Sequence, residues 1–305
     1  MDGNTSCAWP SDAKVSITAT QLDNTQSNDT FVLIKMEFFM RCLAFAFTFL
    51  AAPLQAHELW IEPLAYQVNA DSIAAADVVN GENFEGTKLA YVPQRFRRFV
   101  AVNGGQFANV QGRIGDRPAL QFEPIGEGLH VIAYQSNVSI IDYKEWEKFQ
   151  TFVDHKDLGD VAAAHQERGL PDANFDEAYS RYSKTLIGVG NSEGDDRRLG
   201  FVTEIVALDN PYTTDGLTDI RLQLFYNAEV RSDEQIEVFE KAADGTVTIS
   251  LHRTNEEGIA TVPVKAGHSY MADAVVLREP SEKLASETGA VWETLWANLT
   301  WAMPE

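Results

Sequence analysis

His57 carries the most distinctive chemistry that the sequence offers, because it directly follows a segment that resembles a removable export signal. If the chain is cut between Ala56 and His57, this one residue presents two nitrogen donors, the free α-amine and the ring Nδ1, which together can chelate a metal ion. The α-amine has an ordinary pKa near ~7.7, so it releases its proton to a metal readily at neutral pH. The sequence therefore predicts His57 as a ligand of nickel, cobalt or copper. The alternative is that the signal merely ends there and that a first strand begins.

A metal ion bound at His57 needs further ligands, and the other five histidines differ in how well they could supply them. His130 lies in the apolar run LHVIAY and is predicted to be buried, either hydrogen-bonded in the core or acting as a ligand. His268 follows a glycine in KAGHSY, a turn from which it could reach the edge of a domain. We therefore predict a metal site built from His57, His130 and His268. The histidines that we rank below these are His155, His165 and His252.

We expect the motifs of several large enzyme classes to be missing, among them HExxH, CxxC, GxSxG, the phosphate-binding loop and GxGxxG after a strand. Both cysteines, Cys7 and Cys42, lie upstream of His57, so the exported chain would contain no thiolate and no disulfide. We therefore predict a noncatalytic binding protein rather than an enzyme.

The segment before His57 has the order of a secretory signal peptide. Arg41 precedes an apolar run from Cys42 to Ala52, which is much shorter than the ~20 residues that a transmembrane helix needs, and small residues follow it. We expect residues 36–56 to be this signal and residues 1–35 to be either non-native or disordered. The mature protein is then periplasmic and has no transmembrane helix.

The chain is strongly acidic. It has 24 Lys and Arg against 45 Asp and Glu, which gives a formal net charge of −21. A surface of this kind argues against nucleic acid or anionic lipid as a partner, because both are bound through basic patches.

The elements that must position these residues are mainly β-strands. Period-two or continuous apolar segments such as AAADVV, RRFVAV and LHVIAY predict a β-rich N-terminal domain over residues 57–138. FVTEIVAL, DIRLQLFY and the hairpin QIEVFEKAADGTVTISLH begin a set of about seven strands, which predicts a C-terminal β-sandwich over residues 199–305.

Between these two parts, residues 139–198 are predicted to form a helical insertion or linker. One helix is expected where Trp146, Phe149 and Val153 recur at helical spacing. A second, amphipathic helix is expected from about residue 174 to 186. In this second helix the tyrosines at 179 and 182 would face the core, and the cations at 181 and 184 would face solvent. The alternative is that Arg181 and Lys184 together form an anion site.

Four segments together resemble a bacterial family known as domain of unknown function 4198: AHELWIEP, EAYSRYSKTLIGVG, TEIVALDNPY and VWETLWANLTW. The resemblance extends over the whole of the expected mature chain. It implies a periplasmic component of nickel or cobalt transport, with a metal transporter of the inner or outer membrane as its partner. It also implies that the C-terminal part is similar to the prealbumin-type sandwich of carboxypeptidase regulatory domains.

Three functions are compatible with these observations. The first is a periplasmic protein that binds nickel or cobalt for uptake, which is our prediction. The second is a copper oxidoreductase in which His57 and another imidazole form a histidine brace. The third is a metal-free interaction or carbohydrate-binding module in which Trp292 and Trp296 stack on a ligand, although buried aromatic residues are more common.

Overall fold

The structure is a computed structural model, which describes residues 57–305. This part of the chain is mainly β, as predicted. The expected signal peptide over residues 36–56 and the expected non-native or disordered segment 1–35 lie outside the described residues. Within residues 57–305, no helix is both long enough and apolar enough to cross a membrane.

Ten elements precede the helical segment. They are β1 (Glu58–Pro63), β2 (Gln67–Val68), β3 (Ala74–Glu82), β4 (Glu85–Leu89), the 3-10 helix η1 (Pro93–Arg95), β5 (Phe96–Asn103), β6 (Gln106–Asn109), β7 (Leu120–Phe122), β8 (Gly128–Ser136) and β9 (Ser139–Tyr143). The strands predicted from AAADVV, RRFVAV and LHVIAY are confirmed as β3, β5 and β8.

The rest of the chain contains three helices and nine strands. They are α2 (Trp146–His155), α3 (Val161–Glu167), β10 (Phe175–Val189), β11 (Thr203–Ala207), β12 (Asp219–Tyr226), β13 (Glu229–Val230), β14 (Gln235–Lys241), β15 (Val247–Arg253), β16 (Ile259–Pro263), β17 (Ser269–Arg278), α4 (Glu282–Thr288) and β18 (Trp292–Ala302). The helix predicted around Trp146 is confirmed as α2, and the predicted hairpin is formed by β14 and β15, which pair antiparallel.

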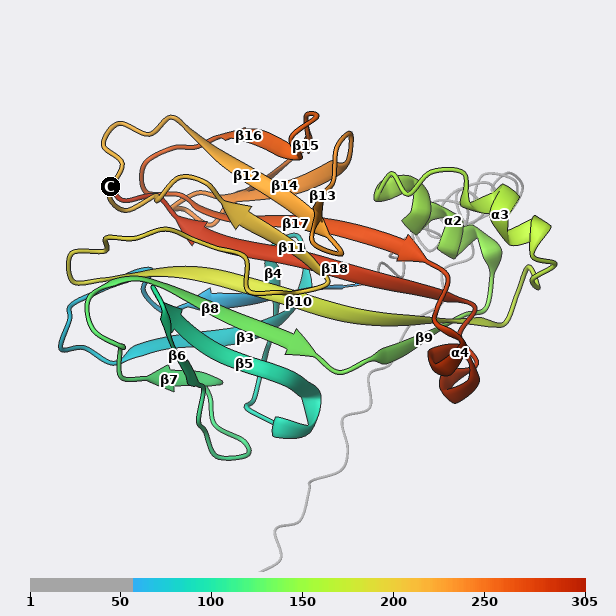
Figure 1. Cartoon of the computed structure of the whole chain (residues 1–305), viewed down its shortest axis with the longest axis horizontal. Helices are drawn as coiled ribbons and strands as arrows, with labels where there is room; N and C mark the ends of the chain where they lie inside the picture. The colour runs from blue at the N-terminus through green and yellow to red at the C-terminus, as the bar shows by residue number, and fades with distance from the viewer. Residues whose placement is uncertain (1–56) are drawn as a thin grey trace, which may run out of the picture. The chain divides into compact units, whose positions relative to one another are not determined.

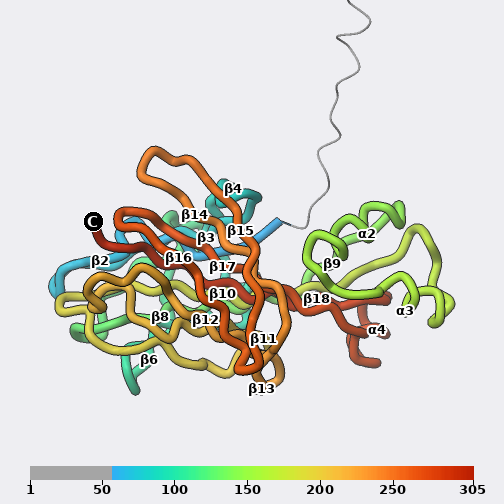
Figure 2. Tube along the Cα trace, turned by 90° about the horizontal axis from the view of Figure 1, so that it is seen from above, coloured from blue at the N-terminus to red at the C-terminus, as the bar shows by residue number. Residues whose placement is uncertain are grey.

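A ten-stranded sheet forms the centre of the molecule, with the order β15-β14-β17-β18-β10-β8-β5-β6 and with β2 and β9 also paired to β10. A four-stranded sheet of β1, β3, β4 and β7 packs on one face of it, and a four-stranded sheet of β11, β12, β13 and β16 packs on the other (Figure 1). Viewed from above, the three helices lie together beyond one end of the sheets (Figure 2).

Strands from both predicted β-rich parts share this central sheet. β5, β6 and β8 come from residues 57–138, whereas β14, β15, β17 and β18 come from residues 199–305. Residues 57–305 belong to one compact unit, and the boundaries predicted at 138 and 198 do not coincide with a break between sheets. The prealbumin-like character of the C-terminal part stays a prediction.

The helix predicted over residues 174–186 was wrong, because this segment is the long strand β10. β10 runs parallel to β18, with Glu177 opposite Trp292 and Thr185 opposite Thr300. It is buried on both faces because a small sheet covers each side of the central sheet, so it lacks the polar alternation of a half-exposed strand. Without that alternation, the spacing of its aromatic residues imitated a helical stripe.

Because this segment was predicted as a helix, two of its cations were wrongly expected to face solvent. Arg181 is only 4% exposed and Lys184 only 1% exposed, and they point to opposite faces of the sheet because side chains alternate along a strand. Both are therefore buried charges, which have to be stabilised by partners.

Candidate functional site

Strand β1 is held along both of its edges. One edge pairs antiparallel with β3, from Glu58 opposite Gly81 to Pro63 opposite Ala76. On the other edge, alternate backbone carbonyls accept hydrogen bonds from side chains of the central sheet. The donors and acceptors are Arg181 to His57, Ser183 to Leu59, and Thr300 to Ile61. The start of β1 is therefore fixed at a defined place on the molecule.

His57 lies at this fixed start, next to the carboxylate that ends β3. Its Nδ1 is 3.2 Å from Oε1 of Glu82, and the two side chains are 55% and 30% exposed. This is a nitrogen donor beside an oxygen donor, and both are accessible from solvent.

His130 is buried in β8, as predicted, and its ring contacts the polypeptide through both nitrogens. The backbone N–H of Ile125 donates to Nε2 at 3.0 Å, and Nδ1 lies 3.2 Å from the carbonyl of Gly128. Burial lowers the pKa of His130, so the ring is neutral. These contacts leave neither ring nitrogen free for a metal.

His268 lies before β17, where its Nδ1 is 2.7 Å from Oε1 of Glu240. Lys265 donates to the same carboxylate oxygen at 2.7 Å. Among the described residues, His57, His130 and His268 thus have different partners on different strands, and the structure does not bring them together. The metal-binding role of these three stays a prediction.

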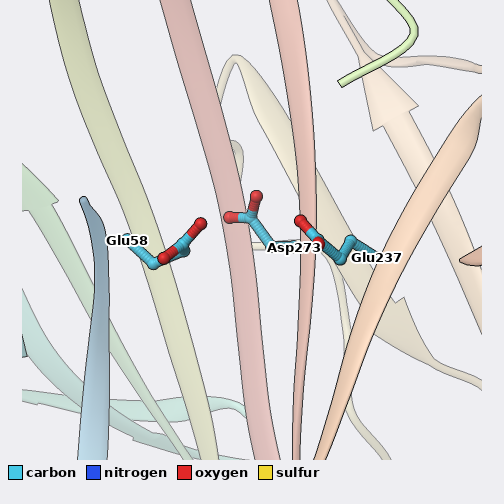
Figure 3. Close-up of side chains that lie close together, drawn as sticks. All are labelled: Glu58, Glu237 and Asp273. Carbon is cyan, nitrogen blue, oxygen red and sulfur yellow. The ribbon is translucent and has the colours of Figure 1, made fainter. Parts of the chain in front are cut away.

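Three carboxylates that the sequence analysis did not single out converge between β1 and the central sheet. They belong to Glu58, Glu237 and Asp273. Within residues 57–305 they form the one group of three or more potential metal ligands whose ligand atoms lie within 4.8 Å of one another (Figure 3). Glu237 and Asp273 are paired across β14 and β17. Glu58 comes from β1, which packs over them.

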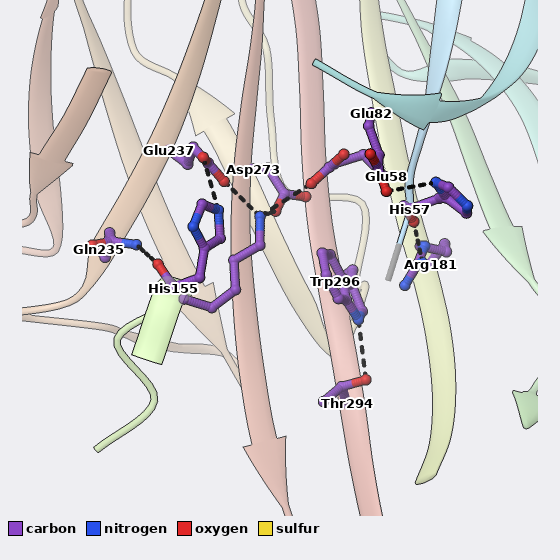
Figure 4. A network of polar contacts seen from close by, with 11 residues as sticks. His57, Glu58, Glu82, His155, Arg181, Gln235, Glu237, Asp273, Thr294 and Trp296 are labelled. Atoms are coloured by element: carbon purple, nitrogen blue, oxygen red, sulfur yellow. Dashed lines mark hydrogen bonds and ion pairs between the residues drawn. The ribbon is translucent and has the colours of Figure 1, made fainter. Parts of the chain in front are cut away.

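A positively charged side chain already occupies the middle of this group. The ammonium of Lys156, directly after α2, lies 3.2 Å from the Glu58 carboxylate, 2.6 Å from Glu237 and 3.0 Å from Asp273. His155 adds a contact of 3.1 Å between its Nε2 and Glu237 (Figure 4). The cluster is therefore an ion-pair network that fastens the end of α2 to the sheet.

Burial decides the direction of the pKa shift for two groups of this cluster, and the charged partners decide it for the other two. Burial raises the pKa of Glu58 to about 6 and also raises the pKa of Asp273, although Lys156 counteracts both. Burial opposes ionisation of Glu237 as well, but hydrogen bonds from His155 and Lys156 outweigh it and lower its pKa. For Lys156 the three carboxylates outweigh burial, which raises its pKa and keeps it charged.

Lys184 forms a second closed ion-pair site on the opposite face of the sheet. Its ammonium is 2.7 Å from Oδ1 of Asp196 and 3.3 Å from Oε1 of Glu204, and it also donates to the carbonyls of Arg197 and Ile205 at 3.0 Å each. Every donor of this buried cation has a partner.

Arg181 is the exception among these buried cations. It donates one hydrogen bond, to the His57 carbonyl, and its guanidinium carbon lies 4.7 Å from the ring centre of Tyr179 and 4.2 Å from that of Trp296. Within residues 57–305 no carboxylate lies at ion-pair distance from it, and its Nε and Nη1 have no hydrogen-bond partner. Burial consequently lowers the pKa of Arg181.

The family described as domain of unknown function (DUF4198) matches residues 54–278. The chain belongs to this family. The resemblance seen in the sequence is thereby confirmed, while the family description itself assigns no activity. No curated protein matches the chain.

The tryptophans considered for stacking on a ligand are buried in this DUF4198 protein. The indole nitrogen of Trp292 donates to Nδ1 of His165 at 3.0 Å, and that of Trp296 donates to Oγ1 of Thr294 at 3.0 Å. Neither ring presents an exposed face to solvent.

The expected absence of a GxSxG motif is wrong, because the segment from Gly190 to Gly194 reads GNSEG and matches this pattern of serine hydrolases. Ser192 follows strand β10 and has a positive φ of 57°, as in a nucleophile turn. It is buried, however, no helix follows it, and no histidine hydrogen-bonds its hydroxyl among the described residues. The segment is a tight turn held by Asn210, which donates to the carbonyls of Ser192 and Gly194.

Proposed function

We propose that this chain is an exported, noncatalytic binding protein that takes up a divalent transition-metal ion, nickel or cobalt, at the amino terminus of its mature form. The observation that carries the proposal is the distance of 3.2 Å between Nδ1 of His57 and the Glu82 carboxylate, at the fixed start of β1. A metal carried there would be passed to a transporter in the inner or outer membrane, as the family resemblance implies.

Three donors would be available at this position after cleavage between Ala56 and His57. They are the new α-amine, Nδ1 of His57 and the carboxylate of Glu82, with water completing the coordination. A set of nitrogen and oxygen donors suits nickel and cobalt. The neighbour of His57 is a carboxylate rather than a second imidazole, which favours these metals over a copper histidine brace.

The hydrogen bond from Arg181 to the His57 carbonyl supports the proposal in a second way. It fixes the backbone on the far side of the residue that would chelate the metal. A ligand that is fixed before binding loses less conformational entropy when the metal arrives. The proposal uses His57 alone of the three histidines, because both nitrogens of His130 are engaged and His268 is bound to Glu240 elsewhere.

The test is calorimetric titration of the mature protein, produced with authentic cleavage so that His57 is the first residue. We expect about one equivalent of Ni²⁺ or Co²⁺ to bind, with an affinity that falls as the pH is lowered because protons compete for the amine and the ring. One residue added before His57 should weaken binding about tenfold or more, since the amine becomes a poorly coordinating amide. His57→Ala and Glu82→Gln should also weaken binding.

His252→Gln is the matched control, because this partly exposed ring lies on β15 and hydrogen-bonds Ser250, whereas His57 lies at the start of β1. It should leave the affinity unchanged. Equal affinity in the wild type, the extended form and His57→Ala would refute the proposal. Copper binding with oxygen-dependent turnover would instead favour an oxidoreductase.

A further inference from the structure

A pocket of about 400 Å³ lies between the β1–β3 sheet and the central sheet. Leu59 and Asn80 line it from the small sheet, whereas Tyr134, Tyr179 and Arg181 line it from the central sheet. A volume of this size is at the small end of ligand-binding pockets, which measure about 300–1,000 Å³.

The pocket is positively charged in an otherwise acidic protein. Two arginines, Arg95 and Arg181, line it, and no aspartate or glutamate does. The chain as a whole carries a formal net charge of −21. Neither arginine takes part in a direct ion pair within residues 57–305, although the more distant carboxylates of Glu58, Glu177 and Asp273 act on Arg181 through space.

Arg181 is the group that most requires a partner. It is almost fully buried, yet its Nε and Nη1 have no hydrogen-bond partner among the described residues. A buried guanidinium with unsatisfied donors costs free energy, because those donors have lost water without gaining an acceptor. Buried Lys156 and Lys184 carry no such cost, since carboxylates surround both.

We infer that this pocket binds a small organic acid, whose carboxylate accepts hydrogen bonds from Arg181. The exposed Arg95 at the rim attracts the anion, and the rings of Tyr134 and Tyr179 pack against its carbon skeleton. The inference does not rest on the metal site, because neither His57 nor Glu82 lines the pocket, although Arg181 also holds the His57 carbonyl.

The other walls indicate an organic rather than an inorganic anion. Apolar side chains of Leu59, Leu89 and Val138 alternate with the amides of Asn80 and Asn137. Mixed walls of this kind fit a molecule with a carbon skeleton and a few polar groups, whereas a phosphate or sulfate ion would leave the apolar surface uncovered.

Access to the guanidinium depends on Tyr179. This ring lines the pocket, contacts Arg181 and is half-buried, whereas Trp296 on the same guanidinium is fully buried. Rotation of the Tyr179 side chain is therefore the movement that admits a carboxylate to Nε or Nη1. Tyr179→Ala should keep the charge and widen this entrance.

The experiment is calorimetric titration of the whole mature protein with acetate, succinate, citrate and benzoate, together with succinamide as an uncharged analogue. At least one carboxylate should bind at about one equivalent, and succinamide should not. Arg181→Gln should weaken binding about tenfold or more, because a charge-assisted hydrogen bond is lost. Arg95→Glu, at an exposed position, should weaken it with little effect on folding.

Arg98→Gln is the matched control. It removes the same charge from β5, but its side chain donates to the carbonyl of Leu199 and lies over Phe201, near the other small sheet. It should leave carboxylate binding unchanged. If Arg181→Gln does not fold, Arg95→Glu and Tyr179→Ala provide the test. An affinity for carboxylates that is unchanged in both variants overturns the inference. Absence of binding by all four acids, or equal binding of inorganic phosphate, also overturns it.

Discussion

Two buried cations on β10 show opposite ways of placing a charge inside a protein. Lys184 faces the sheet of β11 and β12, where Asp196 and Glu204 neutralise it and two carbonyls accept its remaining protons. Arg181, three residues earlier and on the opposite face, has aromatic rings and a single carbonyl as neighbours, beside a pocket. Lys184, which is paired with carboxylates, helps to hold the fold together. Arg181, which has no such partner, lowers the stability of the fold, and we attribute its presence to ligand binding.

The largest effect that separates the two is expected for Lys184→Met. The substitution leaves two fully buried carboxylates without a counter-charge, which should lower the free energy of unfolding by about 3–5 kcal/mol. Chemical denaturation at neutral pH measures it. Arg221→Met, in the exposed pair with Asp209, is the control and should hardly change the unfolding transition. If Lys184→Met changed the unfolding transition as little as Arg221→Met does, Lys184 would not be a stabilising buried cation and the contrast with Arg181 would be lost.

Lys156→Met should come next, with a loss of about 3 kcal/mol, near the lower end of the range for breaking a buried ion pair. The cluster adjoins the partly exposed His155, so water can reach it once the ammonium is gone. Because Lys156 ties the end of α2 to the sheet, hydrogen exchange should increase in α2 and α3 before it increases in β17. Exchange that rises equally everywhere would contradict this anchoring role.

Glu177 provides a pH-dependent test on the Arg181 face of β10. Burial raises its pKa to about 7, and the hydroxyl of Thr294 and the nearby Arg181 only partly offset this. The folded protein therefore holds a proton that the unfolded chain releases near pH 4.5, so stability falls as the pH rises between these values. The expected loss is about 3 kcal/mol from pH 4.5 to pH 7. Glu177→Gln should remove this part of the pH dependence, and unchanged curves would contradict the prediction.

The smallest effect is expected for Arg181→Met, at about 1–2 kcal/mol. The substitution loses one hydrogen bond and the contacts with two aromatic rings, but it breaks no direct ion pair and removes a buried charge that has none. Comparison of its denaturation curve with that of Lys184→Met is the direct check. A loss as large as that of Lys184→Met would mean that Arg181 is a structural group after all.

Much of the fold could be predicted from sequence because most strands have local signals. The alternation in DIRLQLFY and the turn in the β14–β15 hairpin depend only on neighbouring residues. β10 has no such signal, since both of its faces are covered by sheets formed from distant parts of the chain. The β-branched residues Thr185, Ile187 and Val189 near its end were the one local indication of a strand.

The buried polar groups were harder to anticipate. Glu58 lies in the segment AHELW, beside the histidine that the sequence made prominent, but its partner Lys156 is 98 residues away. Lys156 is in turn 81 residues from Glu237 and 117 from Asp273. No spacing rule connects residues so far apart, and a lysine after a helix is usually exposed. Arg181 was misplaced for a different reason, because it was assigned to the outer face of a helix that does not exist.

The side-chain hydrogen bonds along the edge of β1 opposite β3 also have a consequence for the order of folding. Thr300 and Ile61, which are joined by one of these bonds, are 239 residues apart, so the first strand is completed only after the last one is in place. The parallel pairing of β10 with β18 likewise waits for the end of the chain. Contacts of such long range make loop closure slow. We therefore expect the native structure to form late and abruptly during folding. The backbone amides at the start of β1 should be among the last to become protected from hydrogen exchange.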